Sequence, residues 1–389
     1  MNDYFEMGPI RPPSEAQSLL IRVTRNCPWN KCEFCHTYKG EIFSFRSVEE
    51  IKKDIDSAKA IADEILKISW RMGFAGNINQ ALLQALFNRP GPHGHAFQSI
   101  IGWLYFGGTQ VFLQDANSLM ANTSDLVEII KYLKEKFPSI QRITSYSRAR
   151  TLAKKSVSEL TEIRAAGLSR IHIGMETGYD PLLQYMKKGV TAKEQIQAGK
   201  NVVESGISLS EYVMPGLGGT RWWREHAVET ARVLNQIDPD FIRLRTLYVR
   251  HDMPLYSKVE AGEFIRLSDD QVVAEIKLFI ETLDALHSTL VSDHILNLLE
   301  EVQGKLPEGR EKILAVIDRY LALPAEERLL YRVGRRLGYY RSLDDLKDIP
   351  LRRRILRMID EVRRANNQEG TILSEEAERE IYRLMENYI

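Results

Sequence analysis

Six short apolar runs recur along the chain before residue 250, and a stretch with helical periodicity follows most of them. Short apolar runs that end at polar or glycine-rich positions are typical of strands buried in a parallel sheet. Strands that alternate with helices form such a sheet through helical crossovers. The pattern therefore predicts an α/β fold, with strands over residues 19–24, 110–116, 142–147, 170–176, 208–214 and 241–249.

The stretches between these strands carry signals for the beginning and the end of helices as well as apolar periodicity. Ser47 precedes the first of them and Glu50 stands three residues later, which is the spacing of a capping box. Gly167 and Gly206 follow two later periodic stretches, where a glycine can end a helix. Helices are predicted over residues 47–70, 126–137, 157–166, 192–205, 222–237 and 269–286.

Two parts of the chain depart from this alternation. Residues 72–108 add two apolar-periodic segments before the second strand, although connections in α/β units are short. We predict a helical insertion there, with His93 and His95 on its Pro/Gly loop. After about residue 253 the chain becomes helical and charge-dense, and its arginine runs at 332–336 and 352–354 are expected to form solvated faces. The predicted division is an extension over 1–18, a core over 19–250 and a helical C-terminal domain over 251–389.

Alternation within two strands directs charged side chains towards the interior of the fold. Residues 171, 173 and 175 are apolar and share one face, so His172 and Glu176 share the other. Arg243 and Arg245 also share a face, and a buried guanidinium group must find an anion. The anion could be a ligand carboxylate or phosphate, or an internal carboxylate such as Glu176 or Glu211. We expect the internal partners.

Charge and hydropathy narrow the classes of function. The 389 residues include 53 basic and 53 acidic side chains, so the formal charge is zero and gives no overall attraction to nucleic acid. No apolar run approaches the roughly 18 residues of a membrane span. The start of the chain does not resemble an export signal. We therefore expect a cytoplasmic protein with reduced thiols and a small-molecule substrate.

All the cysteines of the chain, Cys27, Cys32 and Cys35, lie close together after the first strand. Their odd number argues against a disulfide framework, and there is no fourth cysteine for an all-thiolate zinc site. Three thiolates suit three irons of a [4Fe–4S] cluster and leave the fourth iron open. The alternative is zinc held by the three cysteines and one histidine, which would be His36, His93 or His95.

The run Cys27-Pro28-Trp29-Asn30-Lys31-Cys32-Glu33-Phe34-Cys35 resembles the cluster loop of the radical S-adenosylmethionine (SAM) superfamily. That loop usually reads Cys-x3-Cys-x2-Cys with an aromatic residue before the last cysteine. Phe34 stands at the aromatic position, and the first spacing is one residue longer here. In that superfamily the open iron binds SAM, and an electron from the cluster cleaves SAM to a 5′-deoxyadenosyl radical that abstracts hydrogen from the substrate.

The resemblance implies a fold, cofactors and a partner. The fold would be an incomplete (β/α)6 barrel of the radical-SAM type, with a doubly wound open sheet as the alternative arrangement of the same strands. The cofactors would be a [4Fe–4S] cluster and SAM. An electron donor of the flavodoxin or ferredoxin type would reduce the cluster.

The resemblance also implies roles at the ends of the strands. Asp115 and Asn117 stand where superfamily members bind the SAM amino group, although either could simply cap the following turn. Glu176 stands where a carboxylate holds the ribose hydroxyls, and a glycine-rich stretch stands where backbone contacts adenine. The expected cofactor-binding residues are Phe34, Asp115, Asn117, Ser145, Glu176, Gly216, Gly218 and Gly219, and those expected to face the substrate are Arg243, Arg245 and His172.

Within the superfamily, the Glu176-Thr177-Gly178 stretch and the glycine-rich end of the fifth strand resemble oxygen-independent coproporphyrinogen oxidase and tRNA-modifying enzymes. That oxidase carries a fourth cysteine two positions after the third, where this chain has Thr37, so a porphyrin substrate is not carried over. The prediction is an enzyme, such as an oxidoreductase, that starts radical chemistry on an organic substrate. The alternatives are a non-catalytic carrier of an iron–sulfur cluster or haem, and an RNA-modifying enzyme.

Overall fold

The structure is a computed structural model that describes residues 4–87, 94–365, 381–383 and 385. It contains two compact units, and each is described by itself. Unit 1 comprises Met1–Gly174 and Lys193–Ser210, and unit 2 comprises Met175–Ala192 and Glu211–Ile389. His93, predicted to lie on a loop, is outside the described residues.

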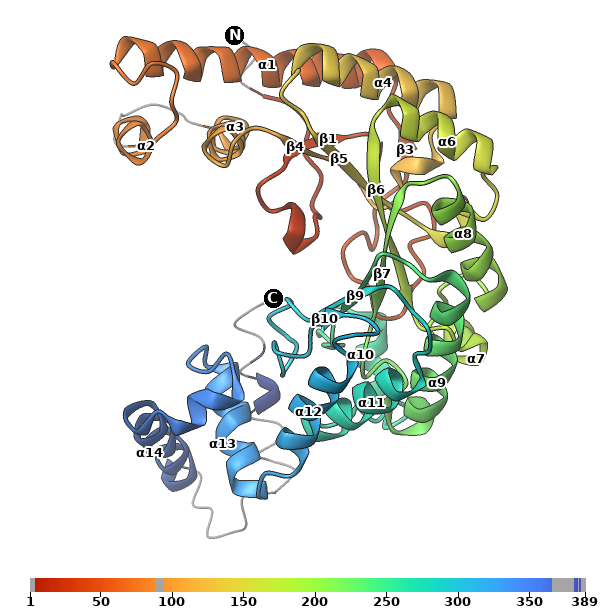
Figure 1. Cartoon of the computed structure of the whole chain (residues 1–389), viewed down its shortest axis with the longest axis vertical. Helices are drawn as coiled ribbons and strands as arrows, with labels where there is room; N and C mark the ends of the chain where they lie inside the picture. The colour runs from red at the N-terminus through yellow and green to blue at the C-terminus, as the bar shows by residue number, and fades with distance from the viewer. Residues whose placement is uncertain (1–3, 88–93, 366–380, 384, 386–389) are drawn as a thin grey trace. The chain divides into compact units, whose positions relative to one another are not determined.

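The described strands form an eight-stranded sheet and a small two-stranded ribbon (Figure 1). The strands of the sheet are β1 (Leu19–Arg22), β4 (Gln110–Gln114), β5 (Arg142–Ser147), β6 (Leu168–Glu176), β7 (Ser208–Val213), β8 (Phe241–Leu244), β9 (Thr289–Val291) and β10 (Gly304–Lys305). Strands β2 (Thr24–Arg25) and β3 (Ser44–Phe45) pair antiparallel as the ribbon.

The order of strands in the large sheet is β1-β4-β5-β6-β7-β8-β9-β10, which is their order along the chain. The pairs β1–β4, β4–β5, β5–β6 and β8–β9 are parallel, whereas β9–β10 is antiparallel. A doubly wound sheet reverses its strand order at a switch point, and this sheet does not. The predicted α/β class with barrel-type winding is confirmed, and all six predicted strands form. Among the described residues the sheet does not close back onto β1.

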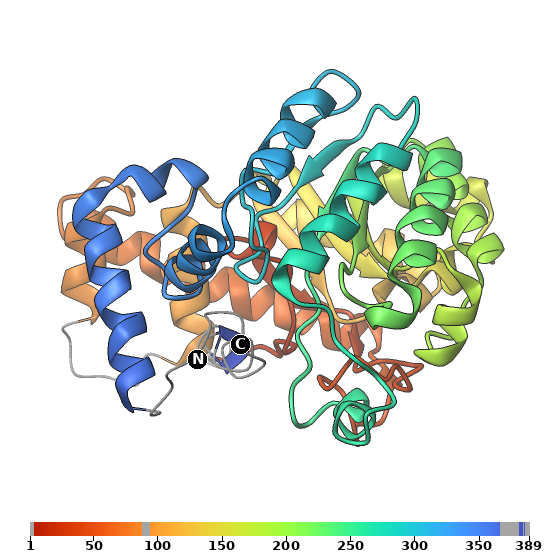
Figure 2. The same ribbon diagram turned by 90° about the horizontal axis from the view of Figure 1, so that it is seen from below.

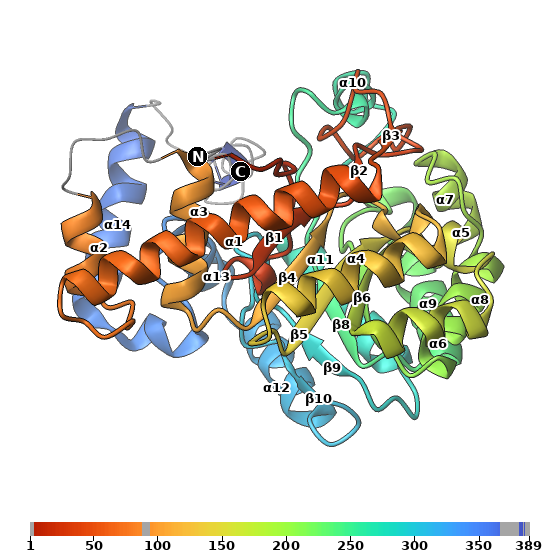
Figure 3. The same cartoon turned by 90° about the horizontal axis from the view of Figure 1, so that it is seen from above.

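Unit 1 covers its part of the sheet with helices (Figure 3). Helix α1 packs against α4, and α4 packs against α6. The helix α1 begins after Ser47, whose hydroxyl accepts the N–H of Glu50 while the Glu50 carboxylate accepts the N–H of Ser47, so the predicted capping box is confirmed. The helices are α1 (Val48–Arg71), α2 (Gln80–Phe87), α3 (His95–Tyr105), α4 (Thr123–Lys136), α5 (Ala149–Leu152), α6 (Val157–Ala166) and α8 (Ala192–Glu204).

Helices α2 and α3 occupy the stretch predicted to be inserted before the second strand. Leu82, Leu86, Ile100 and Ile101 are buried on them, which explains their apolar periodicity. His95 is the first residue of α3 and not a loop residue as predicted.

Unit 2 packs α9 against α11 and α11 against α12 (Figure 2, green to blue). The pattern after residue 253 predicted helices alone, but the region also contributes β9 and β10, which are too short to show an alternation. The helices are α7 (Asp180–Tyr185), α9 (Gly219–Ile237), α10 (Pro254–Glu260), α11 (Asp269–Thr282), α12 (Arg310–Leu321), α13 (Ala325–Arg336) and α14 (Ile349–Ala365).

The arginines of α13 correct one expectation. Arg332, Arg335 and Arg336 were predicted to lie on a solvated face, but all three are buried. Arg336 donates to the carboxylate of Asp269 at 2.6 Å and to a backbone carbonyl, and Arg335 lies 3.4 Å from the carboxylate of Glu300. The prediction was wrong because these partners come from distant parts of the chain and satisfy the buried charges.

None of the helices in the described part of the chain combines the length and the apolar character that crossing a lipid bilayer would require.

Candidate functional site

The cysteine loop, residues 26–43, leaves the sheet after β1 and is closed by the ribbon of β2 and β3. All three cysteines are partly exposed, and Phe34 is buried. The backbone N–H of Asn30 points to the sulfur of Cys27 at 3.4 Å. Lys39 donates to the carbonyls of Asn30 and Cys32, at 3.0 and 2.9 Å. The loop therefore has internal bonds that hold its backbone and leave the sulfur atoms near its surface.

Asp115, predicted to bind the amino group of SAM, lies at the base of this loop and is fully buried. One of its carboxylate oxygens accepts two hydrogen bonds from Arg22, at 2.7 and 2.9 Å, and a third from the N–H of Asn26 at 2.9 Å. Its other oxygen accepts the N–H of Ala116 at 2.8 Å. Asn26 directly precedes Cys27, so this carboxylate fixes the point at which the loop begins.

The other two candidates at these strand ends also bond within unit 1. The side chain of Asn117 accepts from the hydroxyl of Ser147 and the N–H of Arg148, both at 3.0 Å, and donates to Thr151 at 2.9 Å. Ser145 donates to the carbonyl of Leu113 at 3.0 Å. These bonds tie the end of β4 to the end of β5, so both side chains hold strand ends together.

Arg148 is a functional candidate that sequence reasoning missed. Its guanidinium group lies 5.2 Å from the ring centroid of Trp29, inside the cysteine loop. Burial lowers the pKa of Arg148, and the charges of Cys27 and Cys32 oppose that shift, so the cation interacts electrostatically with both side chains. Its position directly after a predicted strand was the available signal, because side chains at the carboxyl ends of parallel strands gather at one edge.

His172, predicted to face the substrate, is fully buried in unit 1. Its Nε2 lies 3.5 Å from the carboxylate of Glu15, which also accepts from Ser18 at 2.6 Å and Arg142 at 3.0 Å. Burial raises the pKa of Glu15, but the hydrogen bonds from His172 and Ser18 and the charge of Arg142 outweigh it and hold that pKa below its usual value. The N-terminal segment thus supplies an internal partner for the histidine.

The three thiols have the chemistry of metal-cluster ligands. The described residues contain no group of three His, Cys, Asp or Glu side chains placed as ligands of one metal ion. A [4Fe–4S] cluster binds each thiolate to a different iron, so three cysteines on one loop can each hold one iron. Three partly exposed thiols on one short loop, beside the cation of Arg148, have the chemistry for such a cluster.

The predicted residues of unit 2 include Glu176, at the end of β6. Its φ angle is +66°, a conformation that is rare for a residue with a side chain. Its carboxylate binds the ammonium of Lys188 at 3.0 Å. Burial, reinforced by the charge of Glu176 and opposed by that of Lys188, raises the pKa of the neighbouring Glu211 well above its usual value. The two carboxyl groups therefore differ, because Glu176 is paired to a cation whereas burial disfavours the ionised form of Glu211.

The glycine-rich turn after β7 is held from behind by α11. The N–H of Gly216, whose φ is +86°, donates to the carboxyl group of Glu275 at 2.7 Å. Glu275 is buried, and its second oxygen has no hydrogen-bond partner among the described residues. Burial raises the pKa of Glu275 to about 8, while the bond from Gly216 opposes the rise. The group that fixes this turn is therefore protonated at neutral pH.

His226 of α9 joins the same turn to the turn after β6. Its Nε2 lies 3.1 Å from the carbonyl of Met214, and its Nδ1 lies 2.8 Å from the hydroxyl of Thr177. A carbonyl can only accept, so Nε2 carries the proton and Nδ1 accepts from Thr177. Burial lowers the pKa of His226 to about 4, so the ring is neutral. Gly178 adds a bond from its N–H to Thr230 at 2.8 Å.

Arg243 and Arg245 find internal partners, but not the ones expected. Arg243 is buried and donates to Asp293 at 2.9 Å, and not to Glu176 or Glu211 as predicted. Arg245 lies 5.7 Å from the ring centroid of Tyr212. Burial and the charge of Arg245 also lower the pKa of His294 to about 3. The prediction failed because residues 293 and 294 follow β9, a strand that the sequence pattern did not show.

The predicted residues thus fall into two groups. Unit 1 contains the cysteine loop and the other candidates that precede Met175, namely Cys27, Cys32, Phe34, Cys35, Asp115, Asn117, Ser145 and His172. Unit 2 contains Glu176, Gly216, Gly218, Gly219, Arg243 and Arg245.

Comparisons with known proteins find relatives of part of the chain. No protein-family pattern matches it. Residues of the chain are 23% identical over 116 positions to a tRNA uridine(34) acetyltransferase of Methanocaldococcus jannaschii, a match that covers 30% of this chain and 21% of that protein. The chain spans about a fifth to a third of the length of the curated relatives it matches.

Solved structures with a similar arrangement include coproporphyrinogen III oxidase from Escherichia coli, which is described as a radical SAM enzyme. That similarity has a TM-score of 0.43 and 15% identity, and covers 68% of this chain and 51% of that one. The archaeal Elp3 of Methanocaldococcus infernus is similar with a TM-score of 0.40 and 14% identity, over 54% of both chains.

Proposed function

We propose that the protein is a radical SAM enzyme, in which Cys27, Cys32 and Cys35 hold a [4Fe–4S] cluster. The observation that carries the proposal is that all three cysteines of the chain stand, partly exposed, on one loop after the first strand of a parallel sheet. When bound, such a cluster supplies the electron that cleaves SAM, and a flavodoxin- or ferredoxin-type protein would renew that electron.

The chain's own residues would hold and shape the site. Asp115 fixes the start of the cysteine loop through the N–H of Asn26, so we assign it a positioning role. Arg148, whose charge interacts with those of Cys27 and Cys32, would offset part of the negative charge of a thiolate-bound cluster. In unit 2, Glu176 and the backbone of the turn at Gly216, Gly218 and Gly219 would contact SAM, with Glu275 and His226 holding that turn in shape.

The test begins with anaerobic reconstitution with iron and sulfide. We expect about four irons per chain and a thiolate-to-iron absorption band, followed by 5′-deoxyadenosine formation from SAM and dithionite. Cys27→Ser, Cys32→Ser and Cys35→Ser should each lose iron and product. Thr37→Ser, in the same loop, is the matched control and should lose neither. Stoichiometric zinc in protein isolated without oxygen, or iron that is indifferent to all three substitutions, would sink the proposal.

A narrower version of this function has one observation in its favour. The matched relative from Methanocaldococcus jannaschii is named for its action on a tRNA uridine. If the substrate of this protein were an RNA, its binding would weaken steeply as salt rises, because phosphate contacts release counterions. A gel-shift titration with total tRNA at two salt concentrations separates this version from a small-molecule substrate.

A further inference from the structure

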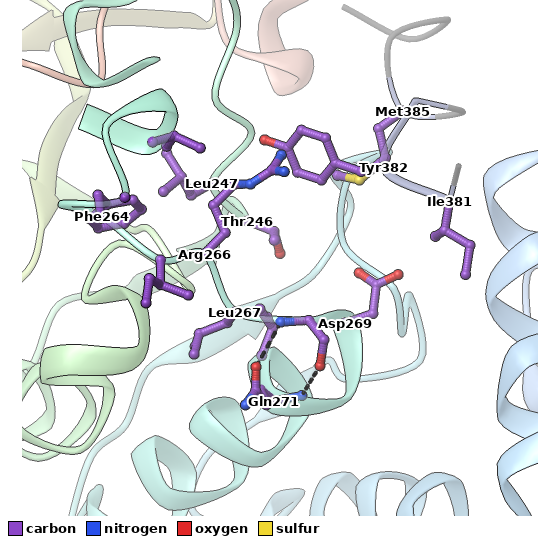
Figure 4. A pocket seen from close by; sticks show the side chains of 15 residues that line it. Thr246, Leu247, Phe264, Arg266, Leu267, Asp269, Gln271, Ile381, Tyr382 and Met385 are labelled. Carbon is purple, nitrogen blue, oxygen red and sulfur yellow. Dashed lines mark hydrogen bonds between the residues drawn. The ribbon is translucent and has the colours of Figure 1, made fainter. Parts of the chain in front are cut away.

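A cavity of about 360 Å³ lies within unit 2, beyond the carboxyl end of β8 (Figure 4). Its walls are residues that follow β8, the segment that leads into α11, and the side chains of Ile381, Tyr382 and Met385. This volume falls in the range of small-molecule sites, which is roughly 300 to 1,000 Å³. The cavity is therefore large enough to hold a metabolite.

The cavity shares its walls with the glycine-rich turn. A Cβ atom added to Gly216 would lie 3.5 Å from the side chain of Val272 and 3.7 Å from that of Leu247, and both residues line the cavity. A Cβ atom at Gly219 would lie 2.7 Å from the carbonyl of Ile265, another lining residue. A ligand in the cavity would thus lie next to the turn proposed to contact SAM.

One cation of the cavity wall stacks on an aromatic ring and has no carboxylate partner in the part of the chain that the structure describes. The guanidinium group of Arg266 lies 3.7 Å from the ring centroid of Tyr382, and within the described ranges no carboxylate is within ion-pair distance of it. Other arginines of unit 2 differ, since Arg328 binds Asp270 at 2.8 Å and Arg336 binds Asp269 at 2.6 Å. A stacked guanidinium keeps in-plane N–H groups for a bidentate anion, so Arg266 is suited to a ligand carboxylate.

The other lining residues indicate which side chain and which second charged group the ligand would have. Phe264, Leu267, Ile381 and Met385 supply apolar surface, and methionine adapts readily to irregular shapes. Asp269 also lines the cavity; Arg336 occupies one of its oxygens, and the other has no partner among the described residues. A carboxylate in the wall disfavours a second anionic group and favours an ammonium group. A zwitterion with an apolar side chain meets all three requirements.

We propose that this cavity binds an α-amino acid with an apolar side chain, whose carboxylate pairs with Arg266 and whose ammonium group is attracted by Asp269. Its role as the substrate pocket rests on the radical SAM function proposed above, but binding itself needs no cluster. Binding and SAM cleavage can therefore fail independently.

The experiment measures binding by calorimetry to the purified full chain, and to a Cys27→Ser, Cys32→Ser, Cys35→Ser triple variant. L-Leucine and L-phenylalanine are the probes. L-Leucinamide lacks the carboxylate, and 2-hydroxy-4-methylpentanoate lacks the ammonium group. We expect the amino acids to bind both proteins equally, and each analogue to bind about tenfold more weakly or worse, which is the loss typical of one charge-assisted hydrogen bond.

Arg266→Gln should weaken amino-acid binding by about tenfold or more, and Arg266→Lys should restore part of it. Arg250→Gln is the matched control, because Arg250 pairs with Asp252 and does not line the cavity. Asp269 is probed through the ligand series, since its removal would leave buried Arg336 without its carboxylate. Absence of amino-acid binding, unchanged binding by Arg266→Gln, or equal binding of the hydroxy acid would each overturn the assignment, whatever the deoxyadenosine assay shows.

Discussion

The strand ends of unit 1 and unit 2 use polar residues in opposite ways. In unit 1, Asp115 and Asn117 stand directly after β4, and their side chains are consumed by bonds that tie neighbouring segments together. In unit 2, the turns after β6 and β7 are held from outside by His226 and Glu275, which lie on helices far along the chain. A polar residue at a strand end therefore identifies the edge of the sheet, but only its partners distinguish scaffold from site.

The contrast also appears in charge. The anchor of unit 1 is a carboxylate bound to the cation of Arg22. The anchor of unit 2 is a protonated carboxyl group beside a neutral imidazole, and no cation of the described residues contributes to its pKa. Removing the charge of Asp115 should therefore destabilise unit 1, whereas ionisation of Glu275 should destabilise unit 2.

Removing the anchor of unit 1 should strongly destabilise the protein at any pH at which its carboxylate is paired with Arg22. Asp115→Ala leaves Arg22 largely buried without this carboxylate and frees the N–H of Asn26. We expect a loss of about 3 kcal/mol in the free energy of unfolding, measured by urea denaturation, with lower iron content after reconstitution. Asp63→Ala, which breaks an exposed pair with Lys59, should cost less than about 1 kcal/mol. Equal losses of unfolding free energy in the two variants would show that Asp115 contributes no more to stability than an exposed ion pair.

The anchor of unit 2 should reveal itself through pH. Glu275→Gln keeps an oxygen that can accept the N–H of Gly216 but cannot ionise. Burial raises the pKa of Glu275 from its ordinary value of 4.5 to about 8, so between those pH values the unfolded chain has lost a proton that the folded chain keeps. The stability of the wild type relative to the variant should fall by about 1.4 kcal/mol per pH unit in that window.

Above about pH 8 the difference between the two proteins should become constant, because the carboxyl group is then ionised in both states of the wild type. Urea unfolding from pH 5 to 9 measures both curves. Parallel curves across the window would show that Glu275 does not retain its proton in the folded protein.

A smaller effect is expected at Gly178, where unit 2 packs the turn after β6 closely on α9. An added Cβ atom would lie 2.7 Å from the carbonyl of Glu229 and 2.9 Å from the Cα of Thr230, and neither backbone atom can rotate away. Gly178→Ala should cost about 1 to 3 kcal/mol.

The control for Gly178→Ala is Gly102→Ala in α3 of unit 1, where an added Cβ atom meets nothing within 4 Å. That change should raise the free energy of unfolding by about 0.5 to 1 kcal/mol, because alanine favours the helix. Thermal unfolding followed by circular dichroism compares the two. A neutral Gly178→Ala would mean that the turn is not packed against α9.

The sequence was sufficient where local pattern decides structure. Six buried strands and the capping box at Ser47 depend on neighbouring residues, and all of them form. It was insufficient where a partner comes from far away. Arg243 was expected to pair with an internal carboxylate such as Glu176 or Glu211, whereas its partner Asp293 follows a three-residue strand that is too short to show an alternation. Arg332 and its neighbours carried a surface composition, and only distant acceptors allowed their burial.

The same limit applies to the site. The cysteine spacing singles out the loop because three thiols in one short run are rare, and the loop's position after β1 could be predicted. The sequence could not predict that Asp115 binds Arg22, 93 positions away in the chain. Periodicity carries no information about pairing across strands. Glu275 and His226 read as ordinary helical residues, and only the folded structure reveals them behind the glycine-rich turn.

The left-handed backbone at Glu176 gives a way to test whether its carboxylate is kept for function or for stability. A carboxylate side chain at φ +66° costs of the order of 1 kcal/mol that glycine would not incur. Selection for thermal stability alone would therefore favour glycine at this position. Glycine would lose the ion pair with Lys188 but would remove the backbone strain. Variant libraries selected for folding and variant libraries selected for the proposed activity should therefore prefer different residues at position 176, and the difference measures how far that activity requires the carboxylate.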